Sequence, residues 1–267
     1  MAELEPYEVY AVRYAHHASA TRAQNFLGGD PHDGPMPLDY FVWAVKGNGR
    51  TFIIDTGFDE TISARRDRGF IRSPGEGLKM IDIDPDTVED VIITHMHYDH
   101  CGNYDLFPRA RYHLQDIEMA YCTGRCMCHP ALQRPFEADD VTAMVRKVFD
   151  GRVTFHDGDQ TLAPGISVHH VGGHSKGLQV VRVWTRRGWL VVASDASHFY
   201  ANMNEGRAFF LVHDHEKTLE GYNRLRELAS DPRAIIPGHD PILLGEYPAP
   251  APGMEGAILR LDADPIK

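Results

Sequence analysis

The stretch "THMHYDHCGN" (residues 94–103) places three histidines and one aspartate within six positions. They come where the short apolar run "DVIITH" (90–95), which is typical of a β-strand, ends. A single buried histidine is usually a hydrogen-bonded core residue, whereas four ligand-type side chains in so short a segment have no comparable structural role. Alternate side chains of an extended turn project to one side, so they can converge on one point or on two neighbouring points. The segment therefore predicts a metal site, formed by His95, His97, Asp99 and His100.

The composition excludes several classes of partner. The formal net charge is −11 over 267 residues, which disfavours nucleic acid because phosphates repel an acidic surface. No run approaches the roughly 18 apolar residues of a membrane-spanning helix, so we expect no membrane insertion. Three of the four cysteines lie within seven residues, too close together for a framework of long-range disulfides. We therefore expect a reduced, cytoplasmic protein. Its oligomeric state stays open, and a homodimer is possible.

Alternating strand and helix patterns predict an α/β fold. Apolar runs typical of strands lie at 7–14, 40–45, 51–57, 90–95, 166–171, 178–184 and 189–196. The turns "KGNG" (46–49) and "TRRG" (185–188) predict two hairpins. Helices are expected at 59–68, 115–121, 137–149 and 215–229. Because strands precede helices in both halves of the chain, we expect two mixed β-sheets packed face to face with helices outside, an αββα sandwich.

Two segments lack any periodicity and are expected to be loops. The first, 15–38, is long for a compact domain, so it either frames a substrate pocket or is a simple surface excursion. The second is the Pro-rich tail, 248–267. We expect residues 1–267 to form one domain.

The string His95-x-His97-x-Asp99-His100 resembles the signature of the metallo-β-lactamase superfamily, and further motifs of that family follow in order. Upstream, "FIIDTG" (52–57) contains Asp55, which the resemblance implies supports the metal ligands without binding metal itself. Downstream, each motif comes just after an apolar run: "VGGHSKG" with His174, "VVASDASH" with Asp195 and "IIPGHD" with His239. The resemblance covers roughly residues 40–240 and implies the metallo-β-lactamase fold.

The resemblance also implies a site for two divalent metal ions. One ion would be held by His95, His97 and His174. The other would be held by Asp99, His100 and His239, and Asp195 would bridge both. Imidazole and carboxylate ligands favour zinc, although iron or manganese could also bind. His169 and His170 compete with His174 by residue type, but they lie inside a predicted strand, whereas His174 follows a Gly-Gly turn at its end.

Such a site predicts a hydrolase. A hydroxide that bridges two cations exists at neutral pH and can attack an acyl carbon, and Asp99 can carry the proton to the departing alkoxide. The chain has no G-x-S-x-G motif that would indicate a serine nucleophile. Within the superfamily the layout most resembles the N-acyl homoserine lactonases, which are quorum-quenching enzymes. The resemblance therefore implies that this chain opens the ring of such a lactone or a related one.

One position departs from the lactonase pattern. These lactonases usually carry a tyrosine three residues after the bridging aspartate, where its hydroxyl contacts the lactone carbonyl. Here that position is His198, and Tyr200 follows two residues later. A histidine could donate the same hydrogen bond or could simply pack beside the site. The departure makes other lactones, esters, thioesters and cyclic amides alternative substrates.

Four other functions carry less support. Thioester hydrolases of the glyoxalase II type usually add a helical C-terminal domain, and nucleic-acid phosphodiesterases do not suit the acidic charge. An iron-dependent oxidoreductase of the diiron flavoprotein type would usually have a glutamate where His97 stands. A non-catalytic interaction protein with this fold would be expected to have lost at least one ligand.

For several remaining residues we expect ordinary packing rather than a functional role. Cys122, Cys126 and Cys128 do not have the spacing of a structural zinc site and are expected in a loop, while Cys101 is expected to be buried beside the metal site. Tyr40, Phe41 and Trp43 are expected in the core. Packing is also favoured for the apolar residues of the first loop, which could instead line an acyl-chain pocket: Phe26, Leu27 and Met36.

Overall fold

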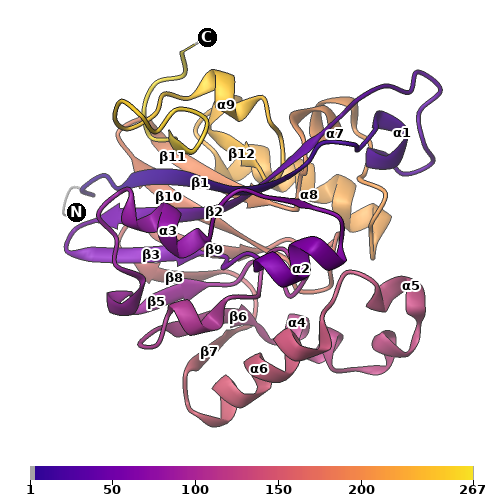
Figure 1. The fold of residues 1–267 in the computed structure, drawn as a ribbon, viewed down its shortest axis with the longest axis horizontal. Coiled ribbons are helices and arrows are strands. Elements are labelled where there is room, and N and C mark those ends of the chain that lie inside the picture. Colours follow the sequence, from indigo (N-terminus) through magenta and orange to yellow (C-terminus); the bar gives the residue numbers. More distant parts are fainter. Residues whose placement is uncertain (1–3, 267) are drawn as a thin grey trace.

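Two β-sheets form the centre of the computed structural model, which describes residues 4–266 (Figure 1). The larger sheet has the order β13-β1-β2-β3-β5-β6-β7, with β4 paired to β1. Its strands are β1 (Glu8–His17), β2 (Leu38–Gly47), β3 (Arg50–Ile54), β4 (Gly69–Phe70), β5 (Asp90–Ile92), β6 (Arg111–Gln115), β7 (Val153–His156) and β13 (Ile258–Arg260). The smaller sheet has the order β12-β11-β10-β9-β8. Its strands are β8 (Gln160–Ala163), β9 (Ile166–His170), β10 (Gln179–Thr185), β11 (Gly188–Ser194) and β12 (Ile235–Pro237).

Both sheets are mixed, as the sequence predicts. In the larger sheet β3, β5, β6 and β7 are parallel, and the other pairs are antiparallel. In the smaller sheet only β11 and β12 are parallel. The two predicted hairpins join β2 to β3 and β10 to β11. In the first, Asn48 and Gly49 both have positive φ angles, 53° and 70°, as a type I′ turn requires.

Helices cover the outer face of each sheet (Figure 1). The larger sheet carries α2 (Glu60–Arg65), α3 (Pro74–Lys79), α4 (Asp116–Cys122) and α6 (Ala138–Phe149). The smaller sheet carries α7 (Tyr200–Glu205) and α8 (His215–Leu228). The short helices are α1 (Arg22–Asn25), α5 (Pro130–Gln133) and α9 (Leu243–Glu246), and single 3₁₀ turns are η1 (Pro85–Thr87), η2 (Tyr104–Leu106), η3 (Arg125–Cys128) and η4 (Pro232–Ala234). The predicted αββα sandwich is confirmed. No helix within residues 4–266 has the length and apolar character that crossing a membrane requires.

Strand β2 shows how the layers are held together, because all its residues from Leu38 to Val45 are buried. Phe41 and Trp43 face the smaller sheet and pack in the core between the two sheets. Tyr40 and Val42 face the opposite way and pack beneath the helices. A strand buried on both faces reads as a continuous apolar run, which is why "YFVWAV" was recognisable. The expectation that Tyr40, Phe41 and Trp43 belong to the core is confirmed.

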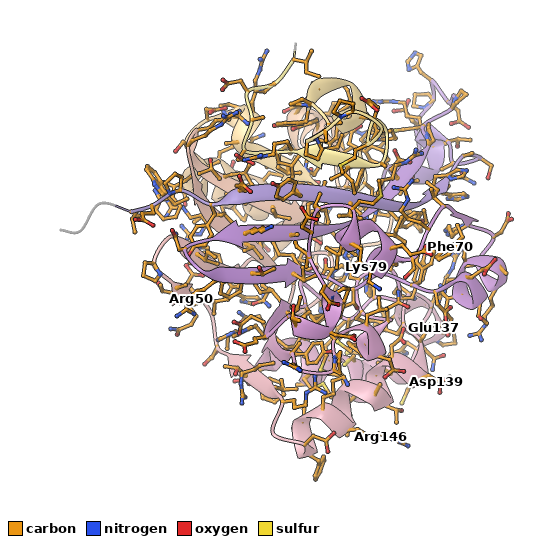
Figure 2. All side chains as sticks on the ribbon, turned by 60° about the vertical axis from the view of Figure 1, so that its left-hand side comes forward. Arg50, Phe70, Lys79, Glu137, Asp139 and Arg146 are labelled. Atoms are coloured by element: carbon orange, nitrogen blue, oxygen red, sulfur yellow. The ribbon has the colours of Figure 1, made fainter. Side chains whose placement is uncertain are left out.

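The four predicted helices are α2, α4, α6 and α8. Helix α6 begins with an acidic turn that includes Asp139 and ends with a basic turn that includes Arg146. Both charges interact favourably with the helix dipole and so stabilise the helix. Figure 2 shows Asp139 toward one end of this helix, next to Glu137, and Arg146 toward the other.

The two segments expected to be loops are partly ordered. Within 15–38, β1 continues to His17, α1 follows, and Leu38 begins β2. Within 248–267, β13 pairs with Tyr10–Val12 of β1, so the tail supplies an edge strand of the larger sheet. The loop expectation is therefore wrong at these positions, because elements of three or four residues are too short for a periodic pattern and depend on distant partners. Residues 1–3 and 267, which the expected domain 1–267 includes, lie outside the described residues.

The C-terminal tail should contribute to stability. Leu261 is fully buried in the core between the sheets, and its N–H donates to the carbonyl of Val9 at 2.8 Å. Leu261→Ala is therefore expected to lower the free energy of unfolding by about 2–5 kcal/mol, measured by urea denaturation. The matched control is Ile266→Ala, because Ile266 is 61% exposed and its loss should change stability by at most about 0.5 kcal/mol. Equal small effects at both positions would show that the tail is dispensable.

Candidate metal centre

The seven side chains predicted to bind metal come together at one end of the sandwich. Each follows the end of a strand: four after β5, one after β9, one after β11 and one after β12. They are His95, His97, Asp99, His100, His174, Asp195 and His239. Their nitrogen and oxygen atoms form compact groups within which every pair lies within 4.8 Å.

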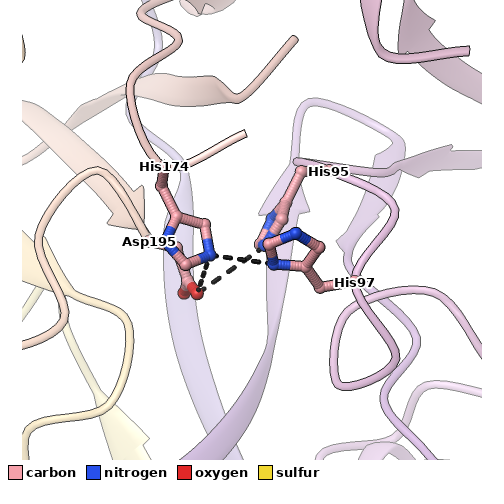
Figure 3. Close-up of side chains that lie close together, drawn as sticks. All are labelled: His95, His97, His174 and Asp195. Atoms are coloured by element: carbon pink, nitrogen blue, oxygen red, sulfur yellow. Dashed lines mark hydrogen bonds and ion pairs between the residues drawn. The ribbon is translucent and has the colours of Figure 1, made fainter. Parts of the chain in front are cut away.

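The first group consists of His95, His97, His174 and Asp195 (Figure 3). Nδ1 of His97 is 3.0 Å from Nε2 of His95 and 2.9 Å from Nε2 of His174. Nε2 of His174 is 3.1 Å from Oδ2 of Asp195. Ligand atoms that bind a tetrahedral zinc ion at roughly 2.0–2.1 Å are about 3.3 Å from one another. The spacing of this group therefore fits a single metal ion.

The second group consists of Asp99, His100 and His239. Oδ2 of Asp99 is 3.7 Å from Nε2 of His100 and 3.8 Å from Nε2 of His239. This group is more open than the first, because Asp99 sits at its edge with a side chain 12% exposed.

Asp195 faces both groups with different oxygen atoms. Oδ1 is 3.1 Å from Nε2 of His100 and 2.9 Å from Nε2 of His239. Oδ2 is 3.1 Å from Nε2 of His174 and 3.6 Å from Nε2 of His95. A carboxylate in this position can bind two ions at once, one through each oxygen.

His100 gives an independent indication that these residues suit a cation. Its Nε2 atom is buried and lies 3.1 Å from Oδ1 of Asp195, but no atom of the described residues forms a hydrogen bond with it, a costly arrangement that a bound cation would relieve. Its other ring nitrogen, Nδ1, lies 2.7 Å from Oδ2 of Asp55. Asp55 is fully buried and accepts hydrogen bonds from the backbone N–H and the hydroxyl of Thr94. It thereby fixes the ring of His100 so that Nε2 points into the group, the usual arrangement around a metal-binding histidine.

The protonation states of three of these groups, His95, His97 and Asp195, suit metal binding. Burial and then the neighbouring imidazoles lower the pKa of His95 and of His97 well below the ordinary value. Burial alone would raise the pKa of Asp195, but the imidazoles around it, first that of His198, lower this pKa well below its usual range. At neutral pH these three groups are therefore neutral imidazoles and an ionised carboxylate, the forms that bind metal.

Glu118 is a residue that the sequence pattern does not single out. It lies in α4 and is fully buried. Its carboxylate accepts hydrogen bonds from the backbone N–H of Met96 at 2.9 Å, the hydroxyl of Ser175 at 2.9 Å and the backbone N–H of Gly177 at 2.7 Å. Met96 separates His95 from His97, and Ser175 follows His174. Glu118 therefore ties together the two loops that carry the first group.

The structure separates the two candidates for the substrate contact. Nε2 of His198 is 3.0 Å from Oδ2 of Asp195, and its ring stacks on Phe209 with 3.5 Å between centroids. His198 lines the cavity beside the metal groups and also forms a third ligand group with Asp195 and His239. Tyr200 packs instead against the apolar cores on both faces of the smaller sheet. His198 is thus the one of the two that faces the cavity.

The histidines that competed with His174 have other partners. His169 contacts Oδ2 of Asp159 at 2.8 Å and the hydroxyl of Ser167 at 2.9 Å. His170 donates from Nε2 to the carbonyl of Lys176 at 2.9 Å. Neither belongs to a ligand group among the described residues.

The cysteines lie partly in helical segments. Cys101 is fully buried beneath the helices, as expected. Cys122 ends α4, and Cys126 and Cys128 lie in the 3₁₀ turn η3. The expectation that these three lie in a loop is therefore wrong, because local backbone hydrogen bonds extend the helical conformation past the Gly124 turn.

A cavity of about 530 Å³ opens beside the two groups. Its apolar wall includes Phe26, Leu38, Phe209, Phe210 and Leu211, and its polar side includes Tyr98 and three arginines. Nine residues of the segment from His17 to Leu38, both included, line the cavity. Of the apolar residues considered in this segment, Phe26 lines the cavity, whereas Leu27 is 40% exposed and Met36 packs near Phe199.

The sequence profile of the metallo-β-lactamase superfamily matches residues 36–239. This chain therefore belongs to the metallo-β-lactamase superfamily. Among its relatives is the N-acyl homoserine lactonase AiiB of Rhizobium rhizogenes, 27% identical over 62% of this chain and 61% of the relative. Another is the N-acyl homoserine lactonase AttM of Azorhizobium caulinodans, 29% identical over 66% of each chain. The chain thus spans less than two thirds of the length of these curated relatives.

Solved structures confirm the fold. A quorum-quenching N-acyl homoserine lactone lactonase matches with a TM-score of 0.73 and 19% identity, covering 89% of this chain and 94% of that one. A probable metal-dependent hydrolase from Staphylococcus aureus matches with a TM-score of 0.70 and 13% identity, covering 99% of this chain and 97% of that one.

The contacts of Glu118 predict a loss of metal affinity when they are broken. Glu118→Gln keeps the volume but turns an NH₂ group toward backbone and hydroxyl donors. We expect zinc affinity, measured by competition with a chromophoric chelator, to fall roughly 10- to 100-fold, the usual effect of losing an outer partner of the ligands. Asp116→Asn, on the exposed side of the same helix, should leave affinity unchanged. Unchanged affinity in both variants would mean that Glu118 does not position the loops.

Proposed function

We propose that this chain is a metal-dependent hydrolase that opens a lactone ring, either of an N-acyl homoserine lactone or of a related lactone. The observation that carries the proposal is the convergence of two ligand groups on Asp195 at the floor of a cavity. The named activity of the curated relatives supports the choice of a lactone.

In this proposal His95, His97 and His174 would hold one ion, Asp99, His100 and His239 would hold the other, and Asp195 would be a ligand of both. Imidazole and carboxylate ligands at this spacing favour zinc over harder cations, which prefer oxygen ligands. Two such ions, when bound, polarise an ester carbonyl and lower the pKa of a water molecule so that it can attack.

Asp99 is the residue that we propose moves the proton. Asp99 lines the cavity at the edge of the second group, and a carboxylate beside a bound ester can act as a general acid or base toward the departing oxygen. The hydroxyl of Tyr14 donates to the backbone carbonyl of Asp99 at 2.8 Å and holds this part of the loop in place.

His198 is the residue that we propose contacts the substrate carbonyl. Stacking on Phe209 holds its ring, and its Nε2 atom lies beside Asp195. Burial lowers its pKa to about 3, so the imidazole is neutral and has a single N–H, which we propose is shared between Asp195 and the carbonyl oxygen of the substrate.

Three wider features belong to the same proposal. Residues 15–38 frame the substrate pocket, because this segment supplies one wall of the cavity. Residues 1–267 act as one domain, because β13 at the end of the chain pairs with β1 at its start. The four unpaired thiols suit work in the reducing cytoplasm. A homodimer stays a prediction that gel filtration can test.

The activity is tested by proton release in a pH-stat, with metal-replete protein and N-acyl homoserine lactones of short and long chain. We expect chelator-sensitive turnover with kcat/KM of about 10⁴ M⁻¹s⁻¹ or more. Asp99→Asn should lose roughly 10²- to 10⁴-fold in kcat and keep most of its metal. No turnover of any lactone by the metal-replete protein would contradict the proposal, and full activity in metal-replete Asp99→Asn would remove Asp99 from the proton transfer.

His198→Phe tests the contact with the carbonyl, because phenylalanine keeps the stack on Phe209 but cannot donate. We expect kcat to fall by about 10²-fold, as when one donor to a developing oxyanion is lost, with metal content unchanged. His198→Tyr, which restores a hydroxyl donor, should recover part of the loss. Loss of a metal ion in His198→Phe would instead identify His198 as a ligand.

A further inference from the structure

We infer that the ester or lactone opened at this site carries a carboxylate, which the guanidinium group of Arg68 binds at the polar end of the cavity. This inference rests on the proposed function, because it names the class of substrate for the same site. It begins from the distribution of charge around the cavity.

The carboxylates that line the cavity are Asp99 and Asp195, and both belong to the ligand groups. The cationic side chains that line it are Arg66, Arg68 and Arg134. Arg66 is neutralised by Glu137, whose Oε1 lies 2.7 Å from it. Neither Arg68 nor Arg134 forms an ion pair within residues 4–266. An acidic chain of net charge −11 thus leaves two guanidinium groups of this cavity without an ion pair among the described residues, and Arg68 is attracted by Asp99 only beyond ion-pair distance.

Arg68 is held rigidly with part of its guanidinium group free. Its Nε donates to the hydroxyl of Tyr98 at 3.2 Å, and its Nη1 donates to the carbonyls of Arg66 and Asp67 at 2.7 and 3.2 Å. Nη2 makes no hydrogen bond among the described residues. These bonds fix the position of the guanidinium group and leave the two N–H donors of Nη2 available. They suit a carboxylate, because hydrogen bonds between oppositely charged groups are stronger than those between neutral groups.

The polar end lies next to the second ligand group. The hydroxyl of Tyr98, which Arg68 contacts, is 3.4 Å from that of Tyr40, and the ring of Tyr40 packs edge-on against His239 with 5.1 Å between centroids. The first ligand group borders the apolar side instead, because the ring of His174 lies 6.4 Å from that of Phe209, which packs on Phe210. A substrate that spans the cavity would place an apolar part over the phenylalanines, its ester bond at the ligand groups and its carboxylate at Arg68.

The competing explanation is that Arg68 only secures the loop around it through its bonds to Arg66 and Asp67. The two explanations differ in what happens to charged and uncharged substrates. A loop-securing residue affects both equally, whereas a binding residue affects only the charged one, through KM.

The test compares matched pairs of N-acyl homoserine lactones whose acyl chains, of four to ten carbons, end in a methyl group or in a carboxylate. With metal-replete protein we expect the carboxylate form to have at least a 10-fold higher kcat/KM at one or more chain lengths. Arg68→Gln should abolish this preference by raising KM for the charged form alone, and Arg68→Lys should restore part of it. Arg109→Gln, an equal loss of charge at an exposed residue away from the cavity, should change nothing.

Equal kcat/KM for both forms at every chain length, or an equal loss for both in Arg68→Gln, would overturn the inference while the lactonase proposal stands. If no lactone is opened at all, a measurement of carboxylate binding tests the role of Arg68 instead. Isothermal titration of the metal-loaded protein with adipate and hexanoate should then show at least 10-fold tighter binding of the dicarboxylate, lost in Arg68→Gln. Equal binding of the two acids would overturn the inference.

Discussion

A buried carboxylate, that of Asp195, stands between two groups of imidazoles, and the arrangement of the site depends on it. Its two oxygens face different groups, one toward His100 and His239 and the other toward His174 and His95. A buried charge costs several kcal/mol unless partners compensate it, so the histidines and this aspartate require one another. The glycine of "PGHD" follows from the same packing, because a Cβ atom on Gly238 would lie 2.8 Å from Oδ1 of Asp195.

Two further buried acids position the histidines without joining the ligand groups. Asp55 holds the ring of His100 through Nδ1, and Glu118 joins the loop after β5 to the loop after β9. Both carboxyl groups have a raised pKa, first because of burial, and both have several hydrogen-bond donors around them. The β-sandwich thus places the strand ends side by side. The hydrogen bonds of the buried acids then fix the orientation of the candidate ligands at those ends.

The cavity is asymmetric in a way that relates structure to choice of substrate. Phe209 and Phe136 pack against histidines of the first group, while Tyr40 packs against His239 of the second. The segment between β1 and β2 lines one side of the cavity, so the connection between two neighbouring strands of the larger sheet also shapes the pocket. Because a single scaffold supports many different reactions, we expect the walls of the cavity rather than the ligand groups to set the choice of substrate.

The sequence by itself determined the features that depend on neighbouring residues. The cluster of candidate ligands from His95 to His100, the two hairpins and the long buried strands were recognisable because spacing and periodicity are local properties. Only the tertiary structure decided the contacts between residues far apart in the chain. Glu118 accepts a hydrogen bond from the backbone N–H of Gly177, 59 positions further along the chain. Strand β13 pairs with β1, although most of the chain separates the two strands. No local pattern records such contacts, because they form only when packing of the two sheets brings those residues together.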